Sequence, residues 1–444
     1  MNQAKRCDLG MDRRSFVKQS IAATALLGNA TSARGDAEVA PSDQFAVAVI
    51  GAGGIARFHA ANQFKPWFRI RAICEVDRAR AESYNQEFAQ GQAFVCSDHE
   101  ELLGRKDIDA FFVCTPDHWH TKITVDALRS KKDVYCEKPL TLTVAEGQLI
   151  DQVLGETEQI LQVGTQQRSD SNFQTAVALA RSGRLGKVKQ ITVAIGGGPT
   201  GGPFSATEPP AELDWNRWLG QAPSTDYIPQ RCHGNFRWWY EYSGGKMTDW
   251  GAHHVDIAQW ALEPQMKEPV SIEVISVTHP VAFENGLPSV NHSYNTAASF
   301  RIRCRLATGT EILIVDNARK AGFDNGVLFE CEDGRYFVNR GKLTGRPIEQ
   351  LAESPIPDEM TAELRKGREP MNHLANFYWS CRERTESQSD AASHLRSLNL
   401  CHLANIAMRL GKTITWDPIS QQIIKDDEAT RWLNRSQREG FEVI

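Results

Sequence analysis

The sequence has no Cys-x-x-Cys pair and no Cys/His group at the spacing of metal ligands, so it carries no pattern of a structural zinc site. It has no basic run in its main body, and its formal net charge is −5, which argues against a nucleic-acid-binding surface. It also has no apolar run of the roughly 20 residues that a membrane-spanning helix needs. We therefore expect no metal, no nucleic-acid partner and no membrane span in the mature protein.

Paired cysteine spacings are missing too, although the chain has ten cysteines. Cys7 lies in the amino-terminal segment, and Cys74, Cys114 and Cys136 each stand at the end of a predicted strand. Cysteines in such places serve as small buried apolar residues. The sequence therefore predicts few or no disulfides.

The amino-terminal segment differs in composition from the rest of the chain. Basic residues precede a short, weakly apolar run, Ile21–Gly28, and small residues follow at 31–33. Residues 13–18, Arg-Arg-Ser-Phe-Val-Lys, resemble a twin-arginine export signal. We expect a signal peptide over 1–35, a linker over 36–43 and a periplasmic mature protein; a disordered basic tail is the alternative.

The stretch from Phe45 to Glu75 has the pattern of a strand, a glycine turn, a helix, a strand and an acid. Residues 51–56 match Gly-x-Gly-x-x-Gly/Ala, in which the first glycine allows a tight turn and the second lets the backbone approach a diphosphate. The helix that follows would direct its free N–H groups at that diphosphate. An acid after the second strand holds a ribose 2′-hydroxyl and repels a 2′-phosphate, so NAD(H) is favoured over NADP(H). A glycine turn without a ligand is the alternative. The cofactor-binding residues predicted here are Gly51, Gly53, Gly54, Ile55, Ala56 and Glu75.

Polar clusters follow three further buried strands, which are predicted at Asp109–Cys114, Asp133–Cys136 and Ile160–Val163. Ligands of open parallel sheets bind beyond the carboxyl ends of the strands. The sequence therefore predicts a Rossmann domain over 44–166 with its ligand at these strand ends. The clusters are Thr115–His120, Glu137–Pro139 and Gly164–Arg168.

Beyond residue 166 the apolar pattern changes. Long segments with alternating apolar and polar residues predict a large, mainly antiparallel, open sheet with one covered face. Met371–Arg382 and Ala392–Leu410 have the pattern of helices. The predicted fold class is therefore α/β, with the Rossmann domain followed by an α+β domain over 167–444. The alternating segments are Lys187–Ile195, Val270–Thr278, Ala298–Ala307, Glu311–Val315 and Val327–Val338.

Two motifs carry residues suited to proton transfer. Lys138, just past a buried strand and beside the predicted nucleotide site, can lose hydration, bond a substrate hydroxyl and take part in proton transfer. Asp249, His253 and Asp256 fall on one stripe of a predicted helix, where carboxylates would flank an imidazole. The plainer alternatives are a lysine paired with Glu137, and a capping acid with a core histidine. A metal site lacks a third ligand.

Aromatic residues are dense between positions 215 and 242. Such residues either line a sugar site or pin a loop, and the sequence favours neither reading. They are Trp215, Trp218, Trp238, Trp239, Tyr240 and Tyr242.

Together these motifs resemble the Gfo/Idh/MocA oxidoreductases, the family of glucose–fructose oxidoreductase and inositol dehydrogenase. The likeness is close over 45–260 and looser beyond. It implies a two-domain NAD(P)-dependent enzyme that forms a homodimer or homotetramer through the open sheet. It rests on the glycine motif, Thr115-Pro116 with His120, Glu137-Lys138-Pro139 and Asp249-x-Gly-x-His253-x-x-Asp256.

The resemblance also implies a role for each matching residue. Lys138 would orient the substrate hydroxyl, His253 would be the general acid/base, and Asp249 would bind substrate and align His253. Glu75 would hold the adenosine ribose. The nicotinamide end would be lined by Thr115, Pro116, His120 and Gln166, with Glu137 and Lys138 beside it. Substrate contacts are expected from Arg168, Trp238, Tyr240, His254 and Asp256.

The residues and the resemblance predict hydride transfer between NAD(H) and a secondary hydroxyl of a sugar, an inositol or a derivative. An exported protein would carry its nucleotide with it, which favours tightly held cofactor and a cycle that regenerates it. Two other functions remain open. One is an NAD-dependent glycoside hydrolase that works by transient oxidation and elimination, and the other is a non-catalytic sugar- or nucleotide-binding protein.

Overall fold

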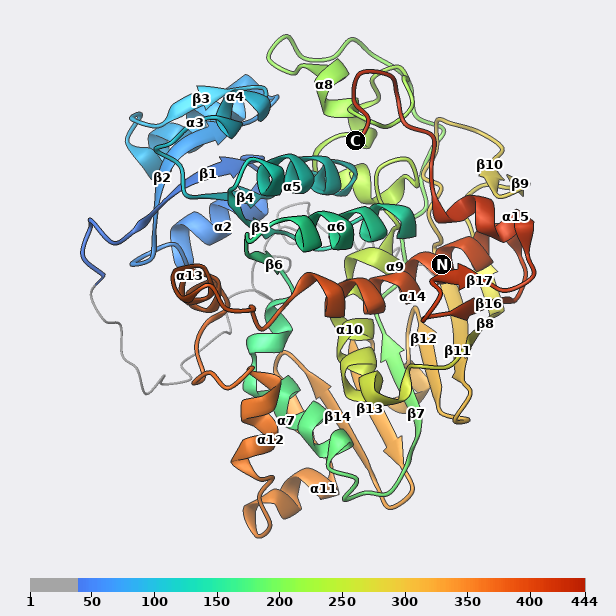
Figure 1. Cartoon of the computed structure of the whole chain (residues 1–444). Helices are drawn as coiled ribbons and strands as arrows, with labels where there is room; N and C mark the ends of the chain where they lie inside the picture. Colours follow the sequence, from blue (N-terminus) through green and yellow to red (C-terminus); the bar gives the residue numbers. More distant parts are fainter. Residues whose placement is uncertain (1–38, 444) are drawn as a thin grey trace, which may run out of the picture. The chain divides into compact units, whose positions relative to one another are not determined.

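The structure is a computed structural model that describes residues 39–443 (Figure 1). The predicted twin-arginine signal and most of the predicted linker lie outside the described residues. Among residues 39–443, no helix combines the length and the apolar character needed to cross a membrane. The nine cysteines of this range are all free and buried, which confirms the prediction of few or no disulfides for this part of the chain.

The first sheet is wholly parallel and has six strands in the order β3-β2-β1-β4-β5-β6. Its central strands are short apolar runs because both of their faces are covered, as expected for a parallel sheet. This order is that of a Rossmann domain, as predicted. The strands are β1 (Phe45–Ile50), β2 (Phe68–Cys74), β3 (Phe94–Cys96), β4 (Ala110–Val113), β5 (Asp133–Cys136) and β6 (Leu161–Val163).

Helices pack on both faces of this sheet, and α5 and α6 lie side by side over one of them (Figure 1). Side chains begin two of the helices: Asp77 accepts a hydrogen bond from the Arg80 N–H, and Thr143 accepts one from the Glu146 N–H. The helices of this half are α2 (Gly54–Asn62), α3 (Arg78–Ala89), α4 (Glu100–Leu103), α5 (His120–Arg129) and α6 (Val144–Glu156).

A helix from far along the chain, α13 (His373–Glu383), completes the other face of the first sheet. Its Phe377 ring lies against Phe68 and Phe112, with centroids 6.0 and 5.7 Å apart. At its end, Arg384 pairs with Asp133 of β5 at 2.5 Å. The half of the chain that carries the first sheet is thus covered partly by the carboxy-terminal half, and the predicted boundary at residues 166 and 167 stays a prediction.

The second sheet has nine strands in the order β15-β14-β13-β7-β12-β11-β8-β16-β17. Only β7 and β12 run parallel, and the other neighbouring pairs are antiparallel, in line with the predicted mainly antiparallel sheet. The strands are β7 (Val188–Ala194), β8 (Val270–Thr278), β11 (Ser299–Leu306), β12 (Glu311–Val315), β13 (Gly326–Cys331), β14 (Arg335–Asn339), β15 (Lys342–Thr344), β16 (Ile414–Asp417) and β17 (Gln422–Ile423), beside a separate pair, β9 (Phe283–Glu284) and β10 (Leu287–Pro288).

One predicted strand, Val327–Val338, is wrong in extent. The chain turns at Glu332–Gly334, where the Cys331 N–H donates to the Gly334 carbonyl at 2.8 Å, and β13 and β14 form a hairpin. An Asp-Gly pair is a strong turn signal inside an alternating run.

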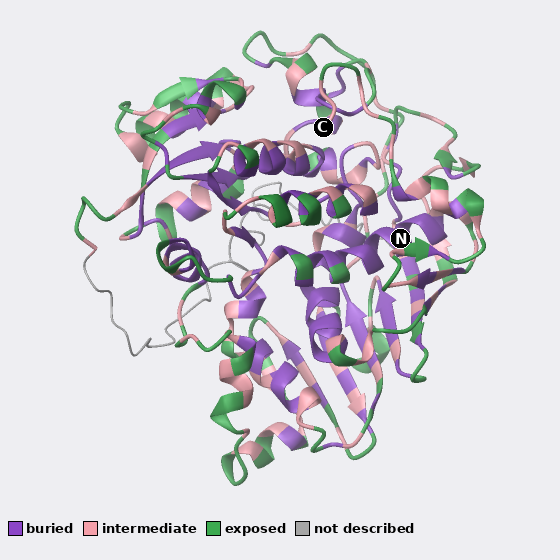
Figure 2. Cartoon of the chain, viewed as in Figure 1, coloured by how far each residue is buried: buried purple, intermediate pink, exposed green. Residues whose placement is uncertain are grey.

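Three helices cover one face of the second sheet, and α10 is buried along its whole length (Figure 2). On the opposite face, Ala194, Leu313 and Val315 form a small apolar cluster of their own. The helices of this half are α7 (Ser171–Arg181), α10 (Gly251–Leu262) and α14 (Ala391–Leu410) on the sheet, and α8 (Trp215–Leu219), α9 (Lys246–Asp249), α11 (Arg346–Glu349), α12 (Asp358–Leu364) and α15 (Asp427–Thr430) around it.

Most of the aromatic cluster at 215–242 pins a loop. Trp239 and Tyr242 are fully buried and Trp218 nearly so, and the Trp239 indole N–H donates to the Gln230 carbonyl at 2.8 Å. Their rings pack with each other and with Trp215, and Trp218 also lines the cavity described next. The loop that they fix carries Arg237 and Lys246 to the site described next.

Candidate active site

A cavity of about 420 Å³ lies at the carboxyl ends of β1, β2, β4 and β5. It runs from the glycine turn to the start of the cis Lys138-Pro139 peptide, and the loop after α8 closes it from the carboxy-terminal half. Its lining includes Gly51, Glu75, Thr115, Glu137, Lys138 and Arg237. The cavity therefore lies where open parallel sheets bind their ligands.

The glycine turn has the shape that a diphosphate requires. Gly51 has φ +89°, and a Cβ there would come within 2.8 Å of the Cys114 and Thr115 backbone. A Cβ at Gly53 or Gly54 would meet nothing within 4 Å, so both leave open space. No side chain caps α2, which leaves its first N–H groups for a ligand. These residues fit a dinucleotide.

Glu75 is held by the backbone beside the turn. Its carboxylate accepts hydrogen bonds from the Ala52 N–H at 2.7 Å and the Asp77 N–H at 3.0 Å. Burial raises the pKa of Glu75, and these two hydrogen bonds oppose that rise. Asp77, which the sequence analysis did not select, lines the same end of the cavity and lies 3.4 Å from Arg80. Two acids therefore face the expected ribose position.

Glu137 anchors the end of β5. Its carboxylate contacts His59 Nε2 at 2.8 Å and accepts hydrogen bonds from the Gln166 amide at 3.1 Å and the Lys138 N–H at 3.3 Å. Burial opposes its ionisation, but the His59 contact lowers the pKa of Glu137. Glu137 thus links Gln166 to the cavity wall, and it fixes the backbone from which Lys138 projects.

His120 carries a buried positive charge. Its two ring nitrogens face carbonyl oxygens, Pro139 at 2.7 Å and Thr115 at 2.9 Å, so both nitrogens act as donors. Burial alone would lower the pKa of His120, but Cys136, followed by Asp117 and the Pro139 carbonyl, raises it to about 10. The imidazolium ties together the ends of β4 and β5, and with them Pro116, at the predicted nicotinamide end.

Lys138 and Asp249, which lie far apart in the sequence, meet at this end of the cavity. The Lys138 ammonium donates to the Asp249 carboxylate at 2.8 Å and to its carbonyl at 2.9 Å. Burial opposes ionisation of Asp249, but Lys138, Arg237 and Lys246 hold its pKa far below the usual range. The pair is therefore ionised, and it places an ammonium group beside the cavity.

His253 lies one turn into α10, and 5% of it is exposed. Its Nδ1 is buried without a hydrogen-bond partner. Burial, followed by the positive charges of Arg340 and Lys138, lowers the pKa of His253 well below its ordinary value. The imidazole is therefore neutral at physiological pH, which is the form that can accept a proton.

Two expected substrate contacts, Arg168 and Asp256, bind each other instead. Arg168 donates two hydrogen bonds of 2.7 Å to the Asp256 carboxylate, and each side chain is 1% exposed. The Ser397 hydroxyl donates to the same carboxylate at 2.7 Å. His253 and Asp256 do share a face of α10, but the Asp256 carboxylate is bound by Arg168 and Ser397, and only Asp249 stays near the cavity.

The other three expected substrate contacts are scattered. His254 is fully buried, with Nε2 2.9 Å from the Asn325 amide oxygen, so it does not face a substrate. Tyr240 lines a second cavity of about 740 Å³, beside α14 and the carboxy-terminal tail. The Trp238 ring lies under the Lys246 ammonium, 5.6 Å away. Of these residues, only Trp238 stays beside the Lys138–Asp249 pair.

Sequence reasoning missed the cations around Asp249. Arg237 Nε lies 3.3 Å and Lys246 Nζ 3.6 Å from its carboxylate. Arg340, from the loop after β14, stacks over Trp250, and its positive charge lowers the pKa of His253. Lys246 stood inside the motif that pointed to Asp249, at helical spacing from it, and this could have indicated the pair. No local signal marks Arg340.

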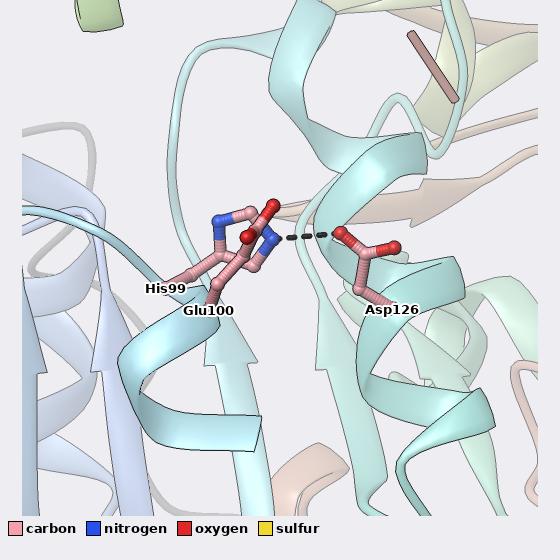
Figure 3. Close-up of side chains that lie close together, drawn as sticks. All are labelled: His99, Glu100 and Asp126. Carbon is pink, nitrogen blue, oxygen red and sulfur yellow. Dashed lines mark hydrogen bonds and ion pairs between the residues drawn. The ribbon is translucent and has the colours of Figure 1, made fainter. Parts of the chain in front are cut away.

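One cluster in the described residues has the composition of a metal site: His99, Glu100 and Asp126, whose ligand atoms lie within 4.8 Å of one another (Figure 3). His99 Nε2 is 2.8 Å from the Asp126 carboxylate (Figure 3). Lys122 Nζ lies 3.1 Å from Asp126 and 3.8 Å from Glu100. An ammonium group thus already balances the carboxylates, and charge pairing accounts for the cluster.

Curated relatives resemble the chain over different lengths. The myo-inositol 2-dehydrogenase of Thermotoga maritima is 24% identical over 307 residues, which is 67% of this chain and 76% of that protein. A glycosyl hydrolase family 109 protein of Shewanella sp. is 33% identical over 162 residues, 31% of this chain and 35% of that protein.

A solved structure shares the fold. The WlbA dehydrogenase of Chromobacterium violaceum, in complex with NADH and UDP-GlcNAcA, matches with a TM-score of 0.60 and 14% identity over 85% of this chain and 97% of that chain. Two family profiles also match: "Oxidoreductase family, NAD-binding Rossmann fold" over residues 45–165 and "Oxidoreductase family, C-terminal alpha/beta domain" over residues 202–443. The second match alone spans more than half of the chain, so the protein belongs to the Gfo/Idh/MocA oxidoreductase family.

Proposed function

We propose that the protein is an NAD(H)-dependent oxidoreductase that acts on a secondary hydroxyl of a sugar, an inositol or a derivative. The observation that carries the proposal is the Lys138–Asp249 contact of 2.8 Å, which closes the end of a cavity that begins at a glycine turn. Bound NAD would supply the hydride acceptor. The task of the chain is then to hold a hydroxyl-bearing carbon beside it and to take up one proton.

We assign the proton to His253. Its depressed pKa keeps it neutral, so it can accept the hydroxyl proton as a carbonyl forms. The Lys138 ammonium would donate a hydrogen bond to the same oxygen and stabilise the charge that develops on it. Asp249 would keep Lys138 charged and oriented through their contact.

We propose NAD over NADP as the cofactor. Gly51, Gly53, Gly54, Ile55 and Ala56 would hold the diphosphate, while Glu75 and Asp77 would face the adenosine ribose. Two acids at that position accept hydrogen bonds from ribose hydroxyls and repel a 2′-phosphate. Arg80, the cation nearby, is paired with Asp77.

We also propose that residues 1–35 are a twin-arginine signal, that the mature protein is periplasmic and that its NAD is tightly held. This part of the proposal is based on the sequence pattern at 13–18. The experiment is to express the full chain, purify the exported form, denature it and identify the released nucleotide by mass spectrometry. Stoichiometric NAD(H) is the expected result. An empty site that binds added NAD weakly would contradict tight retention and a self-regenerating cycle.

An NAD-dependent glycoside hydrolase is the second candidate, and the 33% identity to the family 109 glycosyl hydrolase favours it. The same groups would oxidise a hydroxyl transiently and then assist elimination. Aryl glycosides separate the two functions: a hydrolase releases the aryl alcohol and leaves NAD unchanged, whereas a dehydrogenase gives a keto sugar and NADH. A binding protein without activity would show neither.

We propose a homodimer or homotetramer that assembles through the open face of the second sheet. Leu313 and Val315 alternate with Ile312 and Ile314, so they lie on the face opposite the helices, where Ala318 and Phe323 cover them; Arg303 of β11, opposite Leu313, lies on the part of that face that stays partly exposed. Light scattering after size exclusion should show a multiple of the monomer mass, and Arg303→Glu should reduce it. A monomeric wild type would contradict the assembly.

A further inference from the structure

The Lys138–Asp249 contact lies in an excess of positive charge. The Asp249 carboxylate has Lys138 at 2.8 Å, Arg237 at 3.3 Å and Lys246 at 3.6 Å. Three cations therefore share the single negative charge of the Asp249 carboxylate. The positive charge of Arg340 also reaches this region, where it lowers the pKa of His253.

Other carboxylates neutralise this excess only in part, since Glu137 and Asp170 lie near enough to Arg340 to oppose the fall of its pKa on burial. Asp117 is buried, it accepts a hydrogen bond from the Ser243 hydroxyl at 2.5 Å, and burial raises its pKa. Glu137 faces His59 and Gln166, and His120 adds a buried imidazolium. Oxidised nicotinamide would bring one more positive charge to this end.

Each of the additional cations makes a cation–π contact with an aromatic ring. Arg237 lies over Phe236 at 4.8 Å, Lys246 over Trp238 at 5.6 Å and Arg340 over Trp250 at 5.0 Å. Such stacking holds a cation in a fixed place without a neutralising partner. The same arrangement leaves ammonium and guanidinium N–H donors available to a ligand.

A neutral sugar does not call for this arrangement. Neutral hydroxyls need a few directed hydrogen bonds, and Lys138 already provides the donor for the reacting oxygen. Further cations that share the single Asp249 carboxylate with Lys138 repel one another, which makes an empty site costly unless a bound anion offsets the repulsion. An anionic group near the reacting carbon would offset it.

We propose that the substrate is an anionic sugar, with its carboxylate, sulfate or phosphate group bound between Arg237 and Lys246 and with Arg340 adding to the attraction. This inference rests on the proposed function, because it names the substrate class of the same site. Lys138 and His253 keep their assigned roles, so Arg237 and Lys246 determine specificity and are not themselves proton carriers.

The test compares matched sugars on the purified full-length protein supplied with NAD. The pairs are glucose with glucuronate and galactose with galacturonate, and glucose 6-sulfate and glucose 6-phosphate identify the anion. We expect kcat/KM for at least one anionic member to exceed that of its neutral partner by about tenfold or more, with a KM that rises with salt. Equal kcat/KM for all pairs would overturn the inference and leave the proposed dehydrogenase intact.

The variant Lys246→Met should lower the ratio of kcat/KM for the anionic sugar to kcat/KM for its neutral partner about tenfold or more, whereas Lys246→Arg should retain most of the preference. Lys106→Met, at an exposed lysine in the turn after α4, is the matched control and should change neither value. An equal loss for both sugars would mean that Lys246 is only structural, and the inference would fail.

A binding measurement keeps the inference separate from the proposed function. Calorimetric titration of each sugar into the NADH-loaded protein does not require turnover. If no sugar is oxidised but the anionic member still binds, and Lys246→Met weakens that binding, then the proposed function fails and the inference stands. If anionic and neutral sugars bind equally, or neither binds, the inference is overturned.

Discussion

The two ends of the cavity differ in whether backbone groups or side chains form them. At the nucleotide end, the site is formed mainly by the backbone: Gly51 has φ +89°, Gly53 and Gly54 leave open space, and no side chain caps the start of α2. At the substrate end, side chains from distant segments converge, with three cations around the Asp249 carboxylate. A dinucleotide is common to the family and needs one local shape, whereas substrates differ and need side chains that can vary.

The largest effect should come from the substrate end. Lys138→Ala removes the donor to the reacting oxygen, and kcat should fall by about 10²- to 10³-fold. The Kd for NADH, measured by fluorescence titration, should change less than about threefold, because the diphosphate is held by the backbone. Lys106→Met is the control for loss of a surface lysine. A large loss of NADH affinity with kcat nearly unchanged would contradict this assignment, because Lys138 would then serve cofactor binding and not the reacting oxygen.

Asp256→Asn tests whether a charged pair near the substrate end is structural. It leaves the Arg168 guanidinium buried without its carboxylate, so the free energy of unfolding should fall by about 3–5 kcal/mol. Denaturant titration measures this change. In the folded fraction, the KM for the preferred sugar should stay within about threefold. A KM that rises tenfold with stability unchanged would restore Asp256 as a substrate contact.

Arg168 and Asp256 also show where sequence reasoning reached its limit. The glycine turn and the strand ends were predictable because each depends on neighbours within a few residues. Asp256 lies on the same helical stripe as His253, but periodicity cannot reveal that Arg168 approaches from an earlier segment and pairs with it. Arg340 reaches the site only because the β13–β14 hairpin brings it there, and that hairpin was itself predicted as one strand.

Gly51→Ala tests the backbone at the nucleotide end. The added Cβ would come within 2.8 Å of the Cys114 backbone at a positive φ, so the free energy of unfolding should fall by about 1–3 kcal/mol. Gly54→Ala is the matched comparison for stability, since its Cβ meets nothing within 4 Å, and it should be neutral or slightly stabilising. Thermal unfolding without nucleotide measures both. Equal losses of stability for the two variants would mean that the close approach of Gly51 to the Cys114 backbone does not determine the cost of a side chain in this turn.

The last prediction concerns pH, because buried histidines in different places should change the stability in opposite directions. His254, His373, His394 and His402 are buried, and burial lowers the pKa of each to about 4. Between pH 6.5 and 4 the unfolded chain binds protons that the native chain does not. The free energy of unfolding should therefore fall with pH, by up to about 1.4 kcal/mol per pH unit for each histidine.

His120 should change the free energy of unfolding in the opposite direction with pH, because its pKa is raised to about 10. Its contribution is complete below pH 6.5 and is lost as the pH rises toward 10. Denaturant titrations at pH 5, 6.5 and 9 should therefore show a flatter alkaline side for His120→Gln and a flatter acid side for His402→Gln, which can still bond Thr141. If both variants flatten the same side, the imidazolium at the nicotinamide end does not exist. The positive charge of the substrate end would then be carried by Lys138, Arg237, Lys246 and Arg340 alone.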